Sequence, residues 1–317
     1  MKKILLLFIF CPNFFLHAII AQDFEYNENC RNACQNIISL NIRTAERILE
    51  AEKSMNPDNA IPEMLYNNID FLKMMFYKTD TDFEQAENRM HRRIQFIRSA
   101  GDTSPWYHYA LSEMYFQRAL IRLRNRNVFL TTLDLYYSKT HLDNNLKKYP
   151  RFFMNPKMQA IFQLLFRAIP SNYKELTDFI GLTGEGESPF LLLEKFQNSK
   201  ELQGIYHQEA VILHALALYF AGKDDNQSLH FIGRHQELIR QNSLANFIFS
   251  VIYLQRGKSW IAEENLTKHP QKEHEFHIPF WNYYLGLAKL YRIDSVSVNL
   301  LADYVNKNPG QLYIKSA

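Results

Sequence analysis

The densest group of residues that could do chemistry is a run of imidazoles and carboxylates between residues 269 and 277. It contains His269, Glu273, His274, Glu275 and His277. Both side-chain types suit zinc or copper, so a loop that folds back on itself could bind a divalent metal here. No H-E-x-x-H or comparable partner motif accompanies the run, which favours a polar loop between helices. We therefore treat His269, His274 and His277 as weak metal candidates and expect no cofactor.

A second candidate is the pair Cys30 and Cys34, which a spacing of four residues places on one side of a helix. At this spacing the Cα atoms are about 6 Å apart and the Cβ vectors point poorly toward each other, so a bridge would need strain or fraying. Two alternatives stay open. The cysteines are either two small packed side chains or a local disulfide formed in an oxidising compartment.

Nucleophilic and acid–base catalysis find little support. No G-x-S-x-G turn frames a serine, and the neighbouring carboxylates Glu263 and Glu264 would point to different faces of a helix. His207 and His214 lie on one helix face, which is typical of packed or rim residues. An enzyme would need acids that converge from distant helices. We expect a protein that is not an enzyme.

The composition indicates helices and gives no sign of nucleic-acid binding. The 317 residues are 47% hydrophobic and 14% aromatic, enough for a packed core, and include only 10 Gly and 11 Pro. The formal net charge of +3 is small for a nucleic-acid partner. A long helical chain with a protein or peptide partner fits these values better.

Residues 1–21 have the pattern of a secretory signal peptide. Lys2 and Lys3 precede an apolar stretch that ends at Ala21, a small residue at the expected cleavage site. The alternative is an uncleaved membrane anchor, but Pro12 interrupts a stretch that has about the minimum length for spanning a bilayer. We expect export to the periplasm or cell envelope, with no stable transmembrane segment after cleavage.

Helical spacing of apolar residues continues through an N-terminal block, residues 22–168. One helix is expected from Glu25 to Lys53. Further helices follow Ile61-Pro62 and Ser104-Pro105, where a proline occupies the first turn. The helix after Ser104 is apolar on two sides, which predicts that neighbours cover both.

Arginines form the densest basic region of this block. They are Arg89, Arg92, Arg93, Arg118, Arg122, Arg124 and Arg126. Because the whole chain is nearly neutral, we expect them to form a solvated face that is paired with local acids.

The rear of the chain, residues 191–317, carries a repeat. Gly222 and Gly257 each follow a helical pattern, separated by roughly the 34-residue period of tetratricopeptide repeats. The positions that fit the repeat are Gly222, Tyr253, Gly257, Ala262, Leu266, Leu285 and Gly286. Small residues are needed where two helices cross closely, and large apolar residues fill the grooves beside them. The pattern predicts stacked helical hairpins, that is, an all-α α-solenoid.

Residues 169–190 hold several glycines and prolines and are expected to link the two blocks. Ile169-Pro170-Ser171-Asn172-Tyr173-Lys174, followed by Ile180-Gly181-Leu182-Thr183-Gly184, resembles the "IP-x-NYK … LLG-x-x-G" stretch of a family of exported Bacteroidetes proteins with tetratricopeptide-like helices. That family is distantly similar to the eukaryotic inclusion-body clearance and tetratricopeptide-repeat protein 39 group. The resemblance implies an exported helical-repeat protein and supplies no catalytic residues.

These observations predict a non-catalytic scaffold of the cell envelope that binds a protein or peptide partner. The alternative is a periplasmic enzyme or carbohydrate-handling protein on the same kind of fold.

Near the end of the chain, Leu312-Tyr313-Ile314 is followed by no polar capping helix. We expect an exposed apolar patch there, which binds a partner or supports self-association.

Overall fold

The protein is built from α-helices. The computed structural model describes residues 23–77, 80–169, 174–202, 204, 206–222 and 224–308, in which 76% of the chain is helical and no strand is present. The helices are α1 (Glu28–Ile38), α2 (Ile42–Met55), α3 (Ile61–Phe76), α4 (Asp80–Ser99), α5 (Pro105–Arg124), α6 (Val128–Lys148), α7 (Asn155–Ala168), α8 (Lys174–Ile180), α9 (Pro189–Gln197), α10 (His207–Ala221), α11 (Asp225–Arg234), α12 (Gln236–Gln241), α13 (Ser243–Gln255), α14 (Ser259–Lys268), α15 (Trp281–Leu290) and α16 (Val296–Lys307), with a short 3-10 helix, η2, at Lys200–Leu202. The predicted all-α fold is confirmed.

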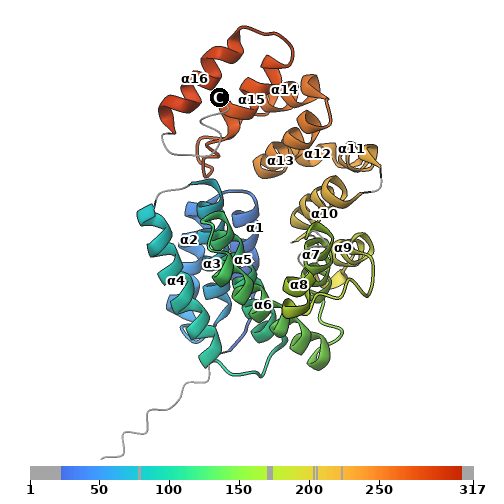
Figure 1. Ribbon diagram of the computed structural model, residues 1–317. Helices are drawn as coiled ribbons and strands as arrows, with labels where there is room; N and C mark the ends of the chain where they lie inside the picture. The colour runs from blue at the N-terminus through green and yellow to red at the C-terminus, as the bar shows by residue number, and fades with distance from the viewer. Residues whose placement is uncertain are drawn as a thin grey trace, which may run out of the picture.

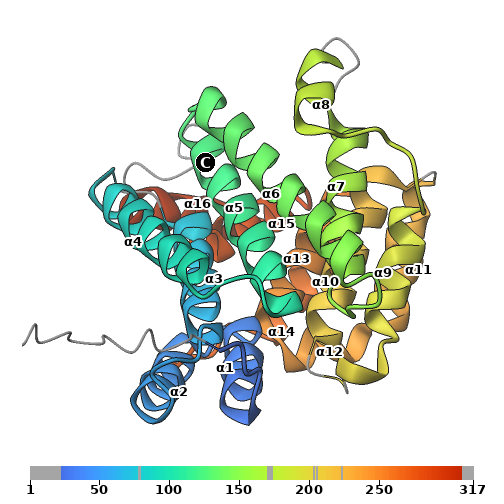
Figure 2. The same ribbon diagram turned by 90° about the horizontal axis from the view of Figure 1, so that it is seen from below.

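The helices pack in pairs along the chain. The leading helix of each pair packs on the leading helix of the next, in the order α1, α3, α5, α7, α10, α13 and α15. Their partners are α2, α4, α6, α9, α11, α14 and α16. The chain also curls, so that α14 to α16 lie above α1 to α5 in Figure 1. Seen from below, α8 projects at one edge and α1 and α2 at the opposite edge (Figure 2).

The first predicted helix is in fact two helices, so the expectation of one helix from Glu25 to Lys53 is wrong. Leu40 takes a left-handed backbone conformation with φ 62°, and the amide of Asn41 donates to the carbonyl of Asn36 at 2.8 Å. This is the hydrogen-bond pattern that usually ends a helix at glycine. Leu40 is fully buried in a cluster with Ile278, and that burial offsets the cost of its conformation.

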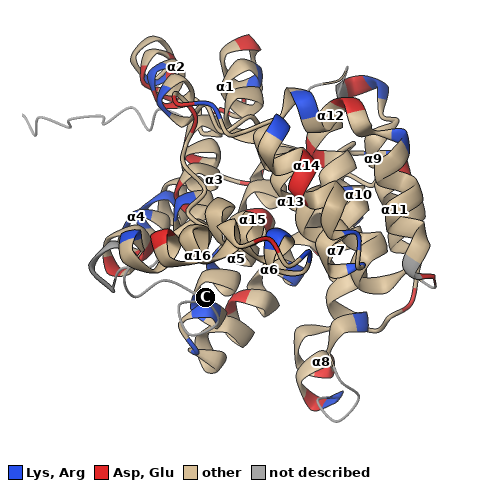
Figure 3. Cartoon of the chain, turned by 90° about the horizontal axis from the view of Figure 1, so that it is seen from above, with Lys and Arg blue, Asp and Glu red and all other residues tan. Residues whose placement is uncertain are grey.

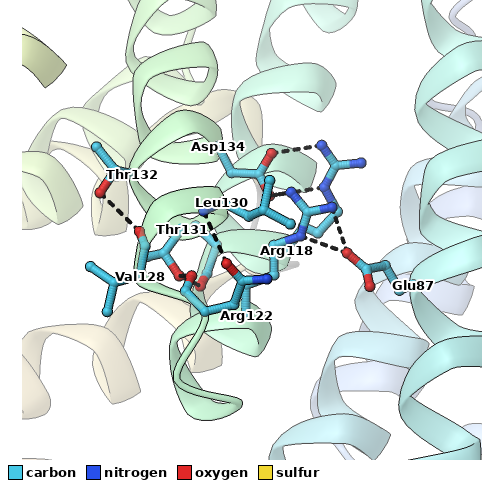
Figure 4. Close-up of polar contacts among 10 residues, drawn as sticks. Glu87, Arg118, Arg122, Val128, Leu130, Thr131, Thr132 and Asp134 are labelled. Carbon is cyan, nitrogen blue, oxygen red and sulfur yellow. Dashed lines mark hydrogen bonds and ion pairs between the residues drawn. The ribbon is translucent and has the colours of Figure 1, made fainter.

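The arginine-rich region lies where α5 is covered by α4 and α6. Arg118 and Asp134 form a two-pronged ion pair with distances of 2.9 and 2.6 Å, and Arg122 joins Asp134 to Glu87 (Figure 4). The prediction that these arginines pair with local acids is confirmed for Arg89, Arg93, Arg118 and Arg122. The prediction of a solvated face is wrong for Arg118, because neighbouring helices leave only 7% of it exposed.

A second buried ion cluster joins the front of the chain to the rear. Lys157 on α7 lies 2.7 Å from Glu113 on α5 and 2.6 Å from Glu209 on α10. Burial alone would lower the pKa of Lys157, but the two carboxylates outweigh it and hold that pKa well above its usual range. Lys157 is therefore a permanent cation at the junction of three leading helices.

The Gly-containing part of segment 169–190 packs against the helices. Gly184 has φ +67°, and a Cβ atom at this position would collide with the ring of Phe166. The main apolar cluster also continues from the front helices into Phe196 and Tyr206. The domain boundaries proposed from the sequence stay predictions, as no feature of the structure decides them.

Two further expectations fall on residues outside the described ranges. They are the signal peptide, residues 1–21, and the apolar turn at Leu312-Tyr313-Ile314. Within the described ranges, no helix combines the length and the apolar character that crossing a bilayer requires.

Candidate functional site

The histidine-rich run of the sequence lies in the loop between α14 and α15. We call residues 269–280 the clasp loop. Its backbone is tied to other elements, because the carbonyl of His269 accepts from Asn246 at 2.8 Å and that of His277 accepts from Tyr77 at 3.1 Å. In the described part of the chain, no group of three or more His, Cys, Asp and Glu side chains could hold a metal ion. The geometry therefore does not bring His269, His274 and His277 together as ligands.

The clasp loop joins the end of the chain to its beginning. The amide of Phe276 donates to the carbonyl of Leu40 at 2.7 Å, and Asn242 on the rear side donates to the carbonyl of Ile38 at 3.1 Å. The ring of Phe76 at the end of α3 lies 6.4 Å from that of Phe280. These contacts connect the first two helix pairs to the last ones.

Both cysteines of the α1 region are buried and free. Burial raises the pKa of the Cys30 thiol and of the Cys34 thiol to about 12. Neither is a thiolate at neutral pH, so neither is an activated nucleophile.

The repeat positions lie at turns and helix crossings. Gly257 ends α13 with φ +73°, and Gly286 on α15 leaves no room for a Cβ atom, which would lie 2.8 Å from Leu301 on α16. Ala262 and Leu266 are fully buried on α14. Gly222 ends α10, Tyr253 is buried on α13, and Leu285 packs at the edge of an apolar cluster.

An open groove lies between α9 and α11, with α10 as its floor. We call it the histidine groove, and its volume is about 760 Å³. It is lined by Phe190, Glu194, Gln197, Asn198, His214, Leu218, Gln227, His230, Phe231, Arg234 and His235. Exposed residues on both walls, among them Glu194 and Arg234, leave it open to solvent.

Aromatic and imidazole rings form a continuous stack along this groove. The ring of His214 lies 6.4 Å from Phe190 and 4.5 Å from Phe231, and Phe231 lies 4.4 Å from His235. The guanidinium of Arg234 lies 5.9 Å from the centre of the Phe231 ring. These rings, of which Phe231 is buried, line the groove beside cationic or titratable groups.

His214 carries the most distinctive polar atom of the groove. Its Nδ1 is buried and has no hydrogen-bond partner in the described structure. Burial lowers the pKa of His214, with smaller effects from Glu194, which raises it, and from His235 and Arg234, which lower it. His214 is therefore neutral at pH 7, and its Nδ1 is an unsatisfied hydrogen-bonding atom buried in the lining of the groove.

His235 shows how the groove fixes a tautomer. Its Nδ1 lies 2.9 Å from the carbonyl oxygen of Phe231. A carbonyl only accepts, so Nδ1 carries a proton. The groove thus combines ring faces with acceptors and donors, as a binding site requires. Its described lining offers Glu194 as the only carboxylate, so it lacks the pair of acids used in glycoside hydrolysis.

This groove was not predicted from the sequence, in which His214 and His207 were expected only as packed or rim residues. A signal was present in the four-residue spacing of Phe190 and Glu194 on α9, and of Phe231 on α11 and His235, which directly follows α11. That spacing puts the two residues of each pair on one side of the helix. It does not indicate that the two faces meet.

Charged residues of both signs are interspersed over the helices when the molecule is viewed from above (Figure 3).

The comparisons with protein-family models, with curated proteins and with solved structures found no match to this chain.

Proposed function

We propose that the protein is a tetratricopeptide-like helical-repeat scaffold of the cell envelope that binds a peptide segment of a partner protein in the histidine groove. The observation that carries this proposal is the groove of about 760 Å³ with a stacked row of rings and an unpartnered imidazole nitrogen. Extended peptides offer backbone donors and acceptors together with side chains that stack on aromatic surfaces.

The pairing of helices supports the repeat-protein part of the proposal. Each leading helix packs on the next leading helix and on its own partner, as in solenoids, where every repeat contacts its neighbours. The tight crossing of Gly286 against Leu301 is the kind of contact that a small residue at a repeat position permits. The sequence resemblance to exported tetratricopeptide-like proteins and the signal-peptide pattern support the location.

The enzyme alternative has less support from this groove. Burial lowers the pKa of His214, and an acid–base mechanism would need a second titratable group aimed at the same substrate atom. A carbohydrate ligand would use the ring faces equally well, but the arginine and glutamate on opposite walls favour a zwitterionic or charged chain.

Peptide display tests the proposal. A random peptide library is panned against the full chain, and the enriched peptides are measured by fluorescence anisotropy. We expect saturable binding that falls by about tenfold or more in His214→Leu, which keeps an apolar side chain but removes the imidazole.

Arg240→Gln on α12 is the matched control, because Arg240 is exposed and lies outside the groove. Its binding should equal that of the unaltered protein. Failure to enrich any saturable binder, or equal loss in the control and in His214→Leu, would reject the histidine groove as a peptide site.

A further inference from the structure

Three consecutive hairpin turns at the rear of the molecule expose large apolar side chains. Phe220 at the end of α10 is 76% exposed and Trp260 at the start of α14 is 56% exposed. At the turn between α15 and α16, Tyr291, Ile293 and Val298 are 64%, 95% and 66% exposed. Each hairpin therefore presents apolar groups to solvent at or beside its turn.

Side-chain contacts connect the first two of these turns. Arg256, at the end of α13, donates to the carbonyl of Tyr219 at 2.9 Å and lies over the ring of Tyr219, 4.8 Å from its centre. Phe220 is the next residue along α10. The end of α10 and the turn that leads to Trp260 are thus direct neighbours.

An ion-pair group connects the second turn to the third. Glu263 lies one helical turn beyond Trp260 and binds Lys289 at 2.9 Å and Arg292 at 2.6 Å. Arg292 directly precedes Ile293 in the sequence. The three turns form one continuous strip, which we call the apolar strip.

Ile293 has an unusual backbone for its residue type. It adopts φ 61°, and the amide of Asp294 donates to the carbonyl of Lys289 at 3.0 Å, which closes the turn. At the end of α13 the corresponding position is Gly257, with φ +73°. A β-branched residue is strained in this conformation, whereas glycine is not. The turn holds an exposed isoleucine where glycine would be more stable.

We propose that the apolar strip binds the surface of a lipid bilayer, with its apolar side chains inserted at the level of the headgroups. Exposed side chains on three separate turns would each need a separate hollow on a protein partner, whereas the interfacial layer of a bilayer yields to them. Tryptophan and tyrosine are the side chains that favour this layer, since each has an apolar body and a polar edge.

The charges of the strip fit the same partner. Its described cations are Arg256, Lys258, Lys289 and Arg292, and its described acids are Asp224, Glu263 and Asp294. Cations that flank inserted side chains keep their charged ends at the headgroup level. Because the excess of positive charge is small, apolar insertion dominates and anionic lipid adds a modest gain.

Vesicle cosedimentation of the full chain tests this inference. The probes are vesicles of phosphatidylcholine alone and of phosphatidylcholine mixed with phosphatidylglycerol. We expect binding to both, tighter to the mixture. Trp260→Ser and Ile293→Gly should each weaken binding by about tenfold, and their combination by on the order of a hundredfold.

Ile293→Gly separates binding from folding, because the glycine relieves backbone strain. Its melting temperature should rise while its vesicle binding falls. Met55→Ser on α2 is the control, since Met55 is 62% exposed outside the strip, and it should bind as the unaltered protein does. All variants share residues 1–21, so any binding through that segment is the same in each.

Three results would overturn the inference. They are no cosedimentation with either vesicle, binding that Trp260→Ser and Ile293→Gly leave unchanged, and a protein dimer that both variants dissociate while vesicle binding persists. The last result would assign the strip to a second copy of the chain.

Discussion

The Tyr77 hydroxyl donates a hydrogen bond to the carbonyl oxygen of His277 at 3.1 Å, although the two residues are 200 positions apart. Tyr77 ends α3, and His277 belongs to the clasp loop before α15. The neighbouring amide of Phe276 donates to Leu40 in the same region. The curl of the helix pairs is therefore closed by contacts between its two ends.

Removing the apolar part of this closure should destabilise the fold. Phe280→Ala would leave a cavity in the cluster that contains Leu40 and Phe247, at a cost of about 3 to 5 kcal/mol in the free energy of unfolding. Urea unfolding measures the loss, and hydrogen exchange at Leu40 should become faster. Phe129→Ala is the control, because Phe129 is 78% exposed and its loss should cost less than about 0.5 kcal/mol. Equal stability of the two variants would show that the ends are not held together.

Asp134 should be the most sensitive charged residue of the front helices. It is fully buried and accepts from Arg118 and Arg122. Asp134→Ala leaves buried guanidinium groups without their counter-charge and should cost about 3 to 5 kcal/mol. Asp143→Ala breaks an exposed pair with Lys139 and should cost at most about 1 kcal/mol. Chemical denaturation compares the two, and a similar cost for both would contradict the buried pairing.

Ala262 should tolerate no larger side chain. It is fully buried on α14 in a cluster with Ala288 and Tyr253. Ala262→Leu should overpack this crossing and cost on the order of 1 to 3 kcal/mol. Thr267→Leu adds bulk at an exposed position of the same helix and should be nearly neutral. If thermal unfolding showed the two variants to be equally stable, the assigned crossing would be wrong.

Stability should fall in mild acid because of His141. Burial, together with His108 and Arg98, lowers the pKa of His141 to about 4, and Asp102 only partly opposes this. The unfolded chain then binds more protons between about pH 4 and about 6.5. Above that range, neutral His141 contributes roughly 3 kcal/mol to the free energy of unfolding. This contribution is lost as pH falls through the range.

Urea unfolding between pH 4.5 and 7.5 measures this contribution. His141→Gln should lose stability less steeply as the pH falls, whereas His274→Gln, at an exposed position of the clasp loop, should follow the unaltered protein. A His141→Gln curve parallel to that of the unaltered protein would exclude His141 as the acid-sensitive group.

Local signals predicted the helices well where the helix ends are encoded nearby. Ser104 and Pro105 predicted the start of α5, and the Ser104 hydroxyl accepts from the amide of Trp106 at 3.3 Å. The two apolar sides of that helix predicted its burial between neighbours, which the structure places at α4 and α6.

Features that depend on distant residues could not be predicted from one sequence. The turn at Leu40 carries no glycine or proline. The free-energy cost of its left-handed backbone is offset by packing of Leu40 in a cluster with Ile278 of the clasp loop, far along the chain. The burial of Arg118 depends on how α4 and α6 cover α5. The histidine groove likewise requires Phe190 and Phe231 on separate helices to face the same space, and periodicity within each helix does not report that.

Hydrogen–deuterium exchange of the full chain, with and without a peptide enriched by display, tests the central claim most directly. Peptide binding in the histidine groove should slow amide exchange in α9 and α11, and His214→Leu should abolish that protection. The apolar strip around Trp260 and Ile293 should exchange at the same rate in both states. Protection confined to the strip or to the clasp loop, with α9 and α11 unchanged, would contradict the proposed site.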